Sequence, residues 1–321
     1  MRTAFNASLK LPDVILSRQM NAQNGNDAEI LSASTLIQAL NAEVRWGSRN
    51  EDNSKIDLFL SFDHPWLPRE RVILLAQIKS GPSYGAVNNG RLKLYKRSFK
   101  EVKRIMNNIC LVWINQNEGE NYWSYIHPNS NSKVTEYGRN HLVTPALRFE
   151  LARCLTRDHS FNIKGGKGII LDFKLFHNDF STYRKNVKNI YRQSSESYNP
   201  LFGNVSLTGF GWNHMFRKSR ELSYKTNSLF VIPYLKTLLK RQPSRYWINR
   251  LEITNRKDYE FSQSEYVLFY EGITTNTGKS GRVTIKLIEE IGFPISWKSE
   301  SLLSQRIIRH VILKSCSWKE I

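Results

Sequence analysis

Three polar side chains interrupt two apolar segments of the N-terminal half. Asp57 follows Ile56 at the start of one segment, and Gln77 and Lys79 lie at the end of the next, residues 72–79. A carboxylate can hold a hard divalent cation, an amide oxygen can add a ligand, and a lysine can steady a charged phosphate. These residue types are therefore the parts of a metal-assisted hydrolytic site.

Both segments have the composition of β-strands. Residues 56–62 alternate in polarity, and residues 72–79 are apolar enough for a central strand. Side chains alternate along a strand, so Gln77 and Lys79 share a face, and Asp57 meets them at a sheet edge if the strands are neighbours. An ordinary ion pair between Asp57 and Lys79 at the strand ends explains the same pattern.

The flanking sequence predicts the elements that would position these residues. Apolar residues recur at helical spacing from Asp27 to about Asn41, and a basic stretch, residues 92–104, is also predicted to be helical. Two further strands are predicted at residues 109–114 and 122–126. This order of elements indicates an α/β layer.

Residues 25–126 resemble the PD-(D/E)xK restriction-endonuclease-like superfamily, in the QxK branch found in bacterial restriction and defence proteins. The matching pieces are Glu29 on the first helix, Ile56-Asp57, the run Gln77-Ile78-Lys79-Ser80-Gly81, and the two later strands. The resemblance implies an αβββαβ domain with bound Mg²⁺ or Mn²⁺.

The resemblance also implies roles for four residues. Asp57, Gln77 and Glu29 would ligate or support the metal, and Lys79 would contact the scissile phosphate or the attacking water. Gln77 departs from the pattern, because other members carry an acid there and a neutral amide weakens metal binding. Glu29 has a second explanation, since the helix dipole favours an acid near a helix start.

The C-terminal half has a different organisation. A helix is predicted from Trp212 to Lys240 with a kink or boundary at Pro233, followed by short strands at 246–254, 265–273, 281–288 and 291–297. This order predicts an α+β domain of helix plus antiparallel sheet. We expect a nuclease domain at 1–130, a connector with a strand and a basic helix at 131–204, and the α+β domain at 205–321.

A second candidate site begins at the start of that predicted helix. His214 and Arg217 lie one helical turn apart, Arg220 follows, and a histidine among cations can do acid/base work on a phosphate without a metal. Residues 205–300 are faintly similar to the RNase fold of barnase, EndoU, colicin nucleases and RelE-type toxins. That similarity implies that Thr284 and Lys286 face the same cleft. The alternative is a basic helix that binds nucleic-acid backbone, with His214 as a capping or core residue.

Composition indicates the partners. Lys plus Arg exceed Asp plus Glu by 47 to 28, a net charge of +19, which indicates nucleic acid, DNA or RNA. No run of about 18 apolar residues occurs, and Asp13 and Arg18 interrupt the N-terminal segment, so we expect a cytoplasmic protein without a membrane partner. Three widely spaced cysteines indicate buried thiols and no structural zinc. The oligomeric state stays open, a homo-oligomer included.

The sequence thus predicts a Mg²⁺-dependent endonuclease, and the family resemblance suggests a role in prokaryotic antiphage defence. The alternative is a non-catalytic protein that binds nucleic acid or a partner through a degenerate nuclease site.

Overall fold

A computed structural model describes residues 13–47, 56–100, 107–127, 134–160, 169–172, 180–299 and 306–321. The fold is mixed α/β and has several sheets. The chain forms two compact units, of which the first comprises Met1–Phe62 and Ile73–Thr144, and the second Asp63–Val72 and Pro145–Ile321. Each unit is described separately below.

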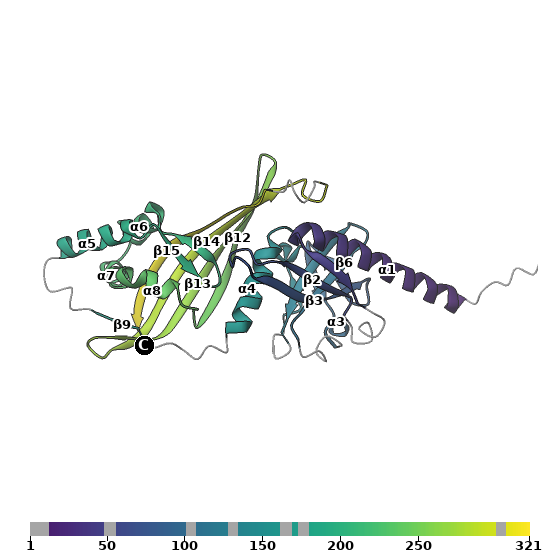
Figure 1. Ribbon diagram of the computed structural model, residues 1–321, viewed down its shortest axis with the longest axis horizontal. Helices are drawn as coiled ribbons and strands as arrows, with labels where there is room; N and C mark the ends of the chain where they lie inside the picture. Colours follow the sequence, from purple (N-terminus) through teal and green to yellow (C-terminus); the bar gives the residue numbers. More distant parts are fainter. Residues whose placement is uncertain are drawn as a thin grey trace, which may run out of the picture. The chain divides into compact units, whose positions relative to one another are not determined.

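The first unit is built on a five-stranded mixed sheet (Figure 1). Its strands, in spatial order, are β1 (Glu43–Trp46), β2 (Leu58–Asp63), β3 (Arg71–Ser80), β6 (Ile109–Asn115) and β7 (Glu120–Ile126). β3 and β6 are parallel, whereas β1 and β6 are antiparallel to β2 and β7, respectively. The four strands predicted from the sequence in this region are all present.

Helix α1 (Asp13–Leu40) covers one face of this sheet. Its buried face includes Ala33, Leu36 and Leu40, and Ser32 Oγ donates a hydrogen bond of 2.8 Å to Asn121 Oδ1 on β7. The helix begins well before the predicted start at Asp27. The predicted end near Asn41 is confirmed, and Asn41 takes a φ of 51° just after the helix.

A small three-stranded sheet packs on the other face. It consists of β4 (Gly85–Asn88), β5 (Arg91–Leu94) and β8 (Glu136–Tyr137). Leu92 and Leu94 of β5 join Leu111 and Trp113 of β6 in one apolar cluster. The helix predicted at 92–104 was therefore wrong in its first residues, which form β5. The helix α3 (Lys96–Lys100) follows, and residues 101–106 lie outside the described part.

The second unit is built on a seven-stranded sheet (Figure 1). Its strands are β10 (Glu196–Asn199), β11 (Gly203–Ser206), β15 (Ile308–Glu320), β14 (Ser280–Pro294), β13 (Tyr259–Thr275) and β12 (Arg245–Arg256), with β9 (Ile170–Leu171) paired to β13. The sheet is mixed, because β11 is parallel to β15 and β9 to β13. The antiparallel pairing predicted for residues 246–297 is confirmed for β12, β13 and β14, and each of the two parallel pairings involves a strand outside that range, β11 or β9.

One long strand replaces the two predicted at 281–288 and 291–297. β14 runs without a break through residues 289 and 290, which separated the two predicted strands, and through Gly292. A Cβ at Gly292 would lie 2.4 Å from the Phe261 ring of β13, so glycine serves close packing between strands here.

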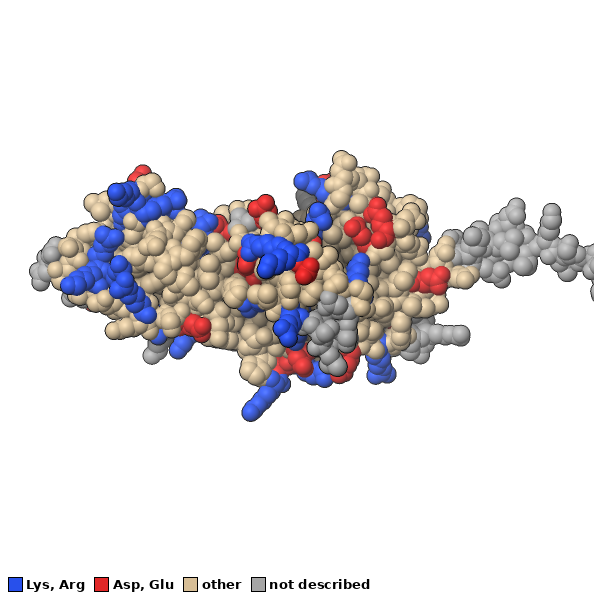
Figure 2. All heavy atoms as spheres, turned by 90° about the horizontal axis from the view of Figure 1, so that it is seen from above, with Lys and Arg blue, Asp and Glu red and all other residues tan. Residues whose placement is uncertain are grey.

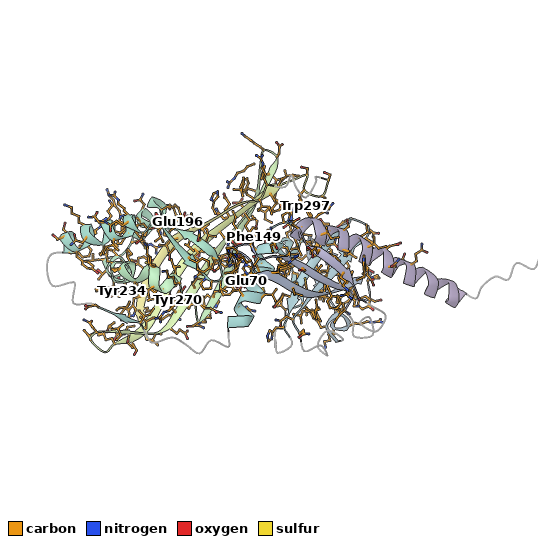
Figure 3. The ribbon with its side chains drawn as sticks, in the orientation of Figure 1. Glu70, Phe149, Glu196, Tyr234, Tyr270 and Trp297 are labelled. Carbon is orange, nitrogen blue, oxygen red and sulfur yellow. The ribbon has the colours of Figure 1, made fainter. Side chains whose placement is uncertain are left out.

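Helices cover one face of this sheet. They are α5 (Phe180–Gln193), α6 (Gly209–Met215), α7 (Leu222–Val231) and α8 (Leu235–Leu239), with the 3₁₀ turn η4 (Ile232–Tyr234) between the last two. Leu229 and Leu235 are buried against Leu268 of β13, and Tyr234 and Tyr270 belong to the same layer (Figure 3). The single helix predicted from Trp212 to Lys240 is thus several helices, and one break falls at Pro233 as expected.

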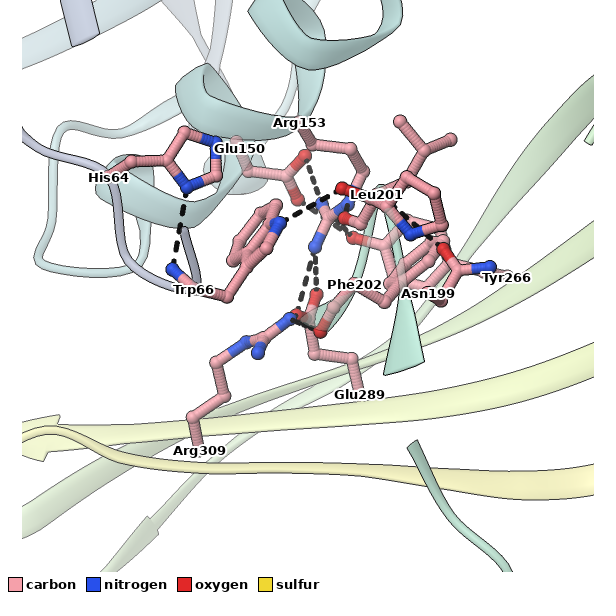
Figure 4. Close-up of polar contacts among 11 residues, drawn as sticks. His64, Trp66, Glu150, Arg153, Asn199, Leu201, Phe202, Tyr266, Glu289 and Arg309 are labelled. Carbon is pink, nitrogen blue, oxygen red and sulfur yellow. Dashed lines mark hydrogen bonds and ion pairs between the residues drawn. The ribbon is translucent and has the colours of Figure 1, made fainter. Parts of the chain in front are cut away.

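A buried cluster of charges joins helix α4 (Leu147–Ser160) to the sheet (Figure 4). Arg153 is fully buried and donates to Glu150 Oε2 (2.9 Å), to Glu289 Oε2 (2.7 Å) and to Tyr266 Oη (2.8 Å). Arg309 of β15 also pairs with Glu289, through Nη2 at 2.6 Å. Burial opposes a charged Arg153, but its carboxylate neighbours, Glu289 first, raise its pKa well above the ordinary value.

The predicted connector, residues 131–204, is therefore divided between the units. Its described residues up to Thr144 belong to the first unit, and those from Pro145 belong to the second, where α4 and α5 contribute to the core. The predicted basic helix is confirmed as α5. The glycine-rich run at 165–168 and residues 131–133, 161–164 and 173–179 lie outside the described residues.

The second unit also contains the loop Asp63–Val72. Trp66 Nε1 donates to Pro200 O at 2.9 Å, and its ring lies against Gly203, whose φ of 66° suits glycine. His64 Nδ1 accepts from the amide of Leu67 at 3.2 Å. This bond requires a neutral ring, consistent with burial and the nearby Arg148, which lower the pKa of His64 to about 4.

We expect Arg153→Ala to lower the free energy of unfolding of the second unit by about 3 to 5 kcal/mol, because it takes the ion-pair partner from the buried Glu150 and leaves the buried Glu289 with Arg309 alone. Arg256→Ala is the matched control. Arg256 pairs with Glu290 at 3.0 Å but is 55% exposed, so its loss should cost about 1 kcal/mol or less. Urea denaturation compares the two variants, and equal losses would contradict a central role for the buried cluster.

Candidate functional site

The carboxylate of Asp57 lies against the backbone of β3. The amide of Asp57 donates to Ala76 O at 3.0 Å, and its Oδ2 accepts from the amide of Ile78 at 2.5 Å. Asp57 is only 9% exposed. The structure therefore brings this carboxylate to the peptide group between Gln77 and Ile78, the centre of the predicted motif.

Alternation along the strands decides which side chains share a face. Leu75 of β3 packs against the apolar cluster beneath the small sheet, to which Leu111 and Trp113 of the paired strand β6 belong. Gln77, two residues after Leu75 and paired with Leu111, therefore belongs to the same face. Lys79, two residues after Gln77, shares that face.

Gln77 is fully buried, yet its amide is unsatisfied. Neither Oε1 nor Nε2 has a hydrogen-bond partner among the described residues, although the side chain is 0% exposed. A buried polar group left without partners costs about 1 to 3 kcal/mol. Such a cost indicates a position held for something other than packing.

Lys79 lies at the partly exposed end of β3. Its ammonium is 5.4 Å from the centre of the Tyr84 ring, and the guanidinium of Arg97 is 5.2 Å from the same ring. Two cations therefore converge on Tyr84 just beyond Gln77. This end of β3 combines a carboxylate, a buried amide and positive charge.

Glu29 lies elsewhere. It is on α1, one turn before Ser32, which bonds to Asn121 on β7. β6 separates β7 from β3 in the sheet, so this turn of α1 is on the order of 10 Å, two strand spacings, from the strand that contacts Asp57. The structure brings together Asp57, Gln77 and Lys79, and places Glu29 on the helix of the other face.

The donors at this place fit a hard cation in type. Among the described residues, no group of three or more His, Cys, Asp or Glu could hold a metal. The oxygen donors are the Asp57 carboxylate and the orphaned Gln77 Oε1, and Mg²⁺ commonly binds through one or two carboxylates while keeping several waters. The residues thus suit a weakly held Mg²⁺ or Mn²⁺ ion.

A second charged cluster crosses the sheet of the second unit. Glu265 of β13 is 7% exposed and pairs with two lysines, Lys286 of β14 at 3.8 Å and Lys314 of β15. Lys314 lies where the register of β14 and β15 shifts. Sequence reasoning named Lys286 but missed Glu265 and Lys314, although an acid inside the apolar run after Ser264 is the same kind of intrusion that marked Asp57.

His214 lies at the C-terminal end of α6, and its Nε2 accepts from Arg220 Nη2 at 3.2 Å. Burial lowers the pKa of His214, and Lys314, Arg220 and Arg217 lower it further. Glu265 opposes this shift. The candidate residues of the second site therefore act on one another electrostatically, and His214 favours the neutral form.

Close packing places α6 beside β15. A Cβ at Gly211 would lie 2.4 Å from Leu313 O, so only glycine allows this approach. Thr284 is partly exposed and, two residues before Lys286, shares its face of β14.

Comparison with known proteins gives no relative: no family model, no curated protein and no solved structure matches this chain. Among the described residues, no helix has the length and apolar character needed to cross a bilayer.

We expect Lys314→Gln to raise the pKa of His214 toward its ordinary value, because it removes the positive charge that contributes most to lowering that pKa. Glu265→Gln should lower it, since a favourable negative charge is lost. Lys319→Gln, at an exposed position of the same strand, is the control. Titration of the imidazole signals by NMR measures the shift, and a pKa that is the same in all three variants would contradict the cluster.

Proposed function

We propose that the protein is a metal-dependent nuclease that hydrolyses phosphodiester bonds at Asp57, Gln77 and Lys79. The observation that carries this proposal is Gln77, whose fully buried amide has no hydrogen-bond partner in the described part of the chain and lies next to the peptide group that holds Asp57. A packing role does not explain such a residue, because an apolar side chain would avoid its desolvation cost.

The order of elements supports the same proposal. α1, β1, β2 and β3 are followed by the hairpin of β4 and β5, by the short helix α3 and then by β6, which returns parallel to β3. Apart from the inserted hairpin, this order is compatible with the αβββαβ arrangement that the resemblance to PD-(D/E)xK domains implies. The resemblance also motivates a role in defence against phage.

Each residue then has a part. Asp57 and Gln77 Oε1 would hold the metal, and Lys79 would stabilise the negative charge that develops on the phosphate. The Ile78 amide fixes the orientation of the Asp57 carboxylate. A bound Mg²⁺ would supply an activated water and polarise the phosphate.

The charge of the chain supports nucleic acid as the substrate class. Beyond the net charge of +19, α5 carries Arg184, Lys185, Lys188 and Arg192 and no acidic residue. Figure 2 shows Lys and Arg side chains gathered at the end where Figure 1 places α5. Such a surface favours contact with phosphates.

We expect Asp57→Asn and Lys79→Ala each to reduce Mg²⁺-dependent cleavage of DNA or RNA by at least about 100-fold, the scale of losing a charge-stabilising group. Asp27→Asn and Lys93→Ala, exposed residues of the same unit, are matched controls. Cleavage of plasmid, linear DNA, total RNA and tRNA is measured with and without metal.

The rival function, a non-catalytic binding protein, predicts no cleavage by the unmodified chain with either Mg²⁺ or Mn²⁺. That result, or full activity in either site variant, would overturn the proposed function.

A second prediction tests the metal without using activity. Gln77→Glu should tighten binding of Mn²⁺ by about tenfold or more, because it adds a charged oxygen ligand. Without metal, the same change should destabilise the first unit, because it buries an unpaired charge. Calorimetric titration and thermal unfolding measure both effects, with the exposed Gln116→Glu as control. Unchanged affinity would place the metal elsewhere.

A further inference from the structure

The sheet of the second unit presents an exposed aromatic residue on the face away from its helices. Trp247 of β12 is 62% exposed and pairs with Val267 of β13, whose neighbours Tyr266 and Leu268 point into the helical core. Phe269 shares the face of Trp247, and the two rings meet edge to face with centroids 4.9 Å apart. A large ring left mostly in water on a regular strand suggests a contact surface.

Cations surround these two rings. The guanidinium of Arg245 lies 5.1 Å from the centre of the Phe269 ring, and that of Arg282 lies 4.8 Å from it. Arg282 Nε is buried and has no hydrogen-bond partner among the described residues. Lys286 pairs with Val267 from the other side, so Trp247, Val267 and Lys286 form one row across three strands.

The charge on this face is unbalanced. Its cations are Arg245, Arg282, Lys286 and Lys314, whereas the carboxylates that pair with them are Glu265 and Glu271. Four positive charges against two negative ones leave an excess of two beside the exposed ring.

We propose that this face binds single-stranded nucleic acid, with a base stacked on Trp247 and neighbouring phosphates held by Arg282 and Lys286. An exposed ring flanked by cations matches the two chemical features of an unpaired strand, a base with a π-face and a charged backbone. A duplex keeps its bases stacked on one another, and an acidic polypeptide has no base to stack, so neither uses Trp247. This binding surface goes beyond the proposed hydrolysis at Asp57 and does not depend on it.

Fluorescence anisotropy of labelled 15-nucleotide strands tests the proposal, in EDTA so that no metal-dependent cleavage interferes. The probes are oligo(dT), oligo(rU), a DNA duplex of the same length, and heparin as a polyanion without bases. Trp247→Ala should weaken binding of both single strands by about 5- to 100-fold, the range for loss of one stacked base. Heparin binding should not change.

Two variants control for folding and for the mere loss of a tryptophan. Trp247→Phe keeps a stacking ring and should retain most of the affinity. Trp46→Ala removes another exposed tryptophan, 47% exposed on β1, and should have no effect. If the Trp247→Ala protein does not fold, the affinities of Trp247→Phe and Trp247→Leu are compared instead. These two side chains are of similar size, but only phenylalanine can stack on a base.

The phosphate contacts have their own test. Arg282→Gln should reduce the slope of log affinity against log salt concentration by about 0.7 for a single strand, the value for one lost contact. Lys236→Gln, an exposed change on α8, should leave the slope unaltered.

Three results would overturn the proposal. They are single-strand affinity that is equal in Trp247→Ala and Trp46→Ala, equal loss of heparin and oligonucleotide binding in Trp247→Ala, or duplex binding that also depends on Trp247. A difference between oligo(dT) and oligo(rU), with both dependent on Trp247, would support it and identify the preferred strand.

Discussion

Burial of the Arg153 guanidinium is the interaction on which the second unit depends. A fully buried cation is tolerated only when every partner is in place, and here the partners come from α4, from β13 and from β14. Glu289 is shared with Arg309 of β15, and burial, which would raise its pKa, is outweighed by the two arginines, Arg153 first, so that its pKa is lowered. The helix and the three strands contribute to one buried network, so loss of any one of them would remove ion pairs or hydrogen bonds from the groups that remain. This favours cooperative folding of the unit.

The first unit contains a buried polar side chain, Gln77, whose hydrogen bonding contrasts with that of Arg153. Each guanidinium nitrogen of Arg153 has a hydrogen-bond partner, whereas both amide atoms of Gln77 have none among the described residues. The neighbouring Asp57 is fixed by the Ile78 amide, so the local geometry is ordered although the amide is not satisfied. Order without satisfaction is what a binding position requires, because the ligand must supply the missing partner.

The sequence predicted the parts of the fold that follow simple periodicity. The strands around Asp57 and Gln77 were predicted because apolar alternation is local, and their meeting followed from strand pairing. The charged contact between α4 and the sheet was not predictable, since Arg153 makes it and charged residues normally mark a surface. β15 was missed because Lys314 and Ser315 interrupt its alternation where the ladder shifts register. The pairing of Glu265 with Lys314 was not predicted, because the two residues lie on different strands and are far apart in the chain.

Positive charge is concentrated on particular surfaces of the second unit. In the second unit, Glu150 and Glu289 pair with the buried Arg153, and Glu265 pairs with two lysines of the sheet. These carboxylates therefore neutralise cations of the interior and of the sheet. α5, which has no acid of its own, and the face around Trp247 carry the excess. Like charges concentrated on a folded surface repel one another and oppose compactness. A polyanion that bound the folded chain would relieve this repulsion, so the proposed nucleic-acid ligand would stabilise the surfaces that bind it. The destabilising effect of these charges would then be greatest in the free protein.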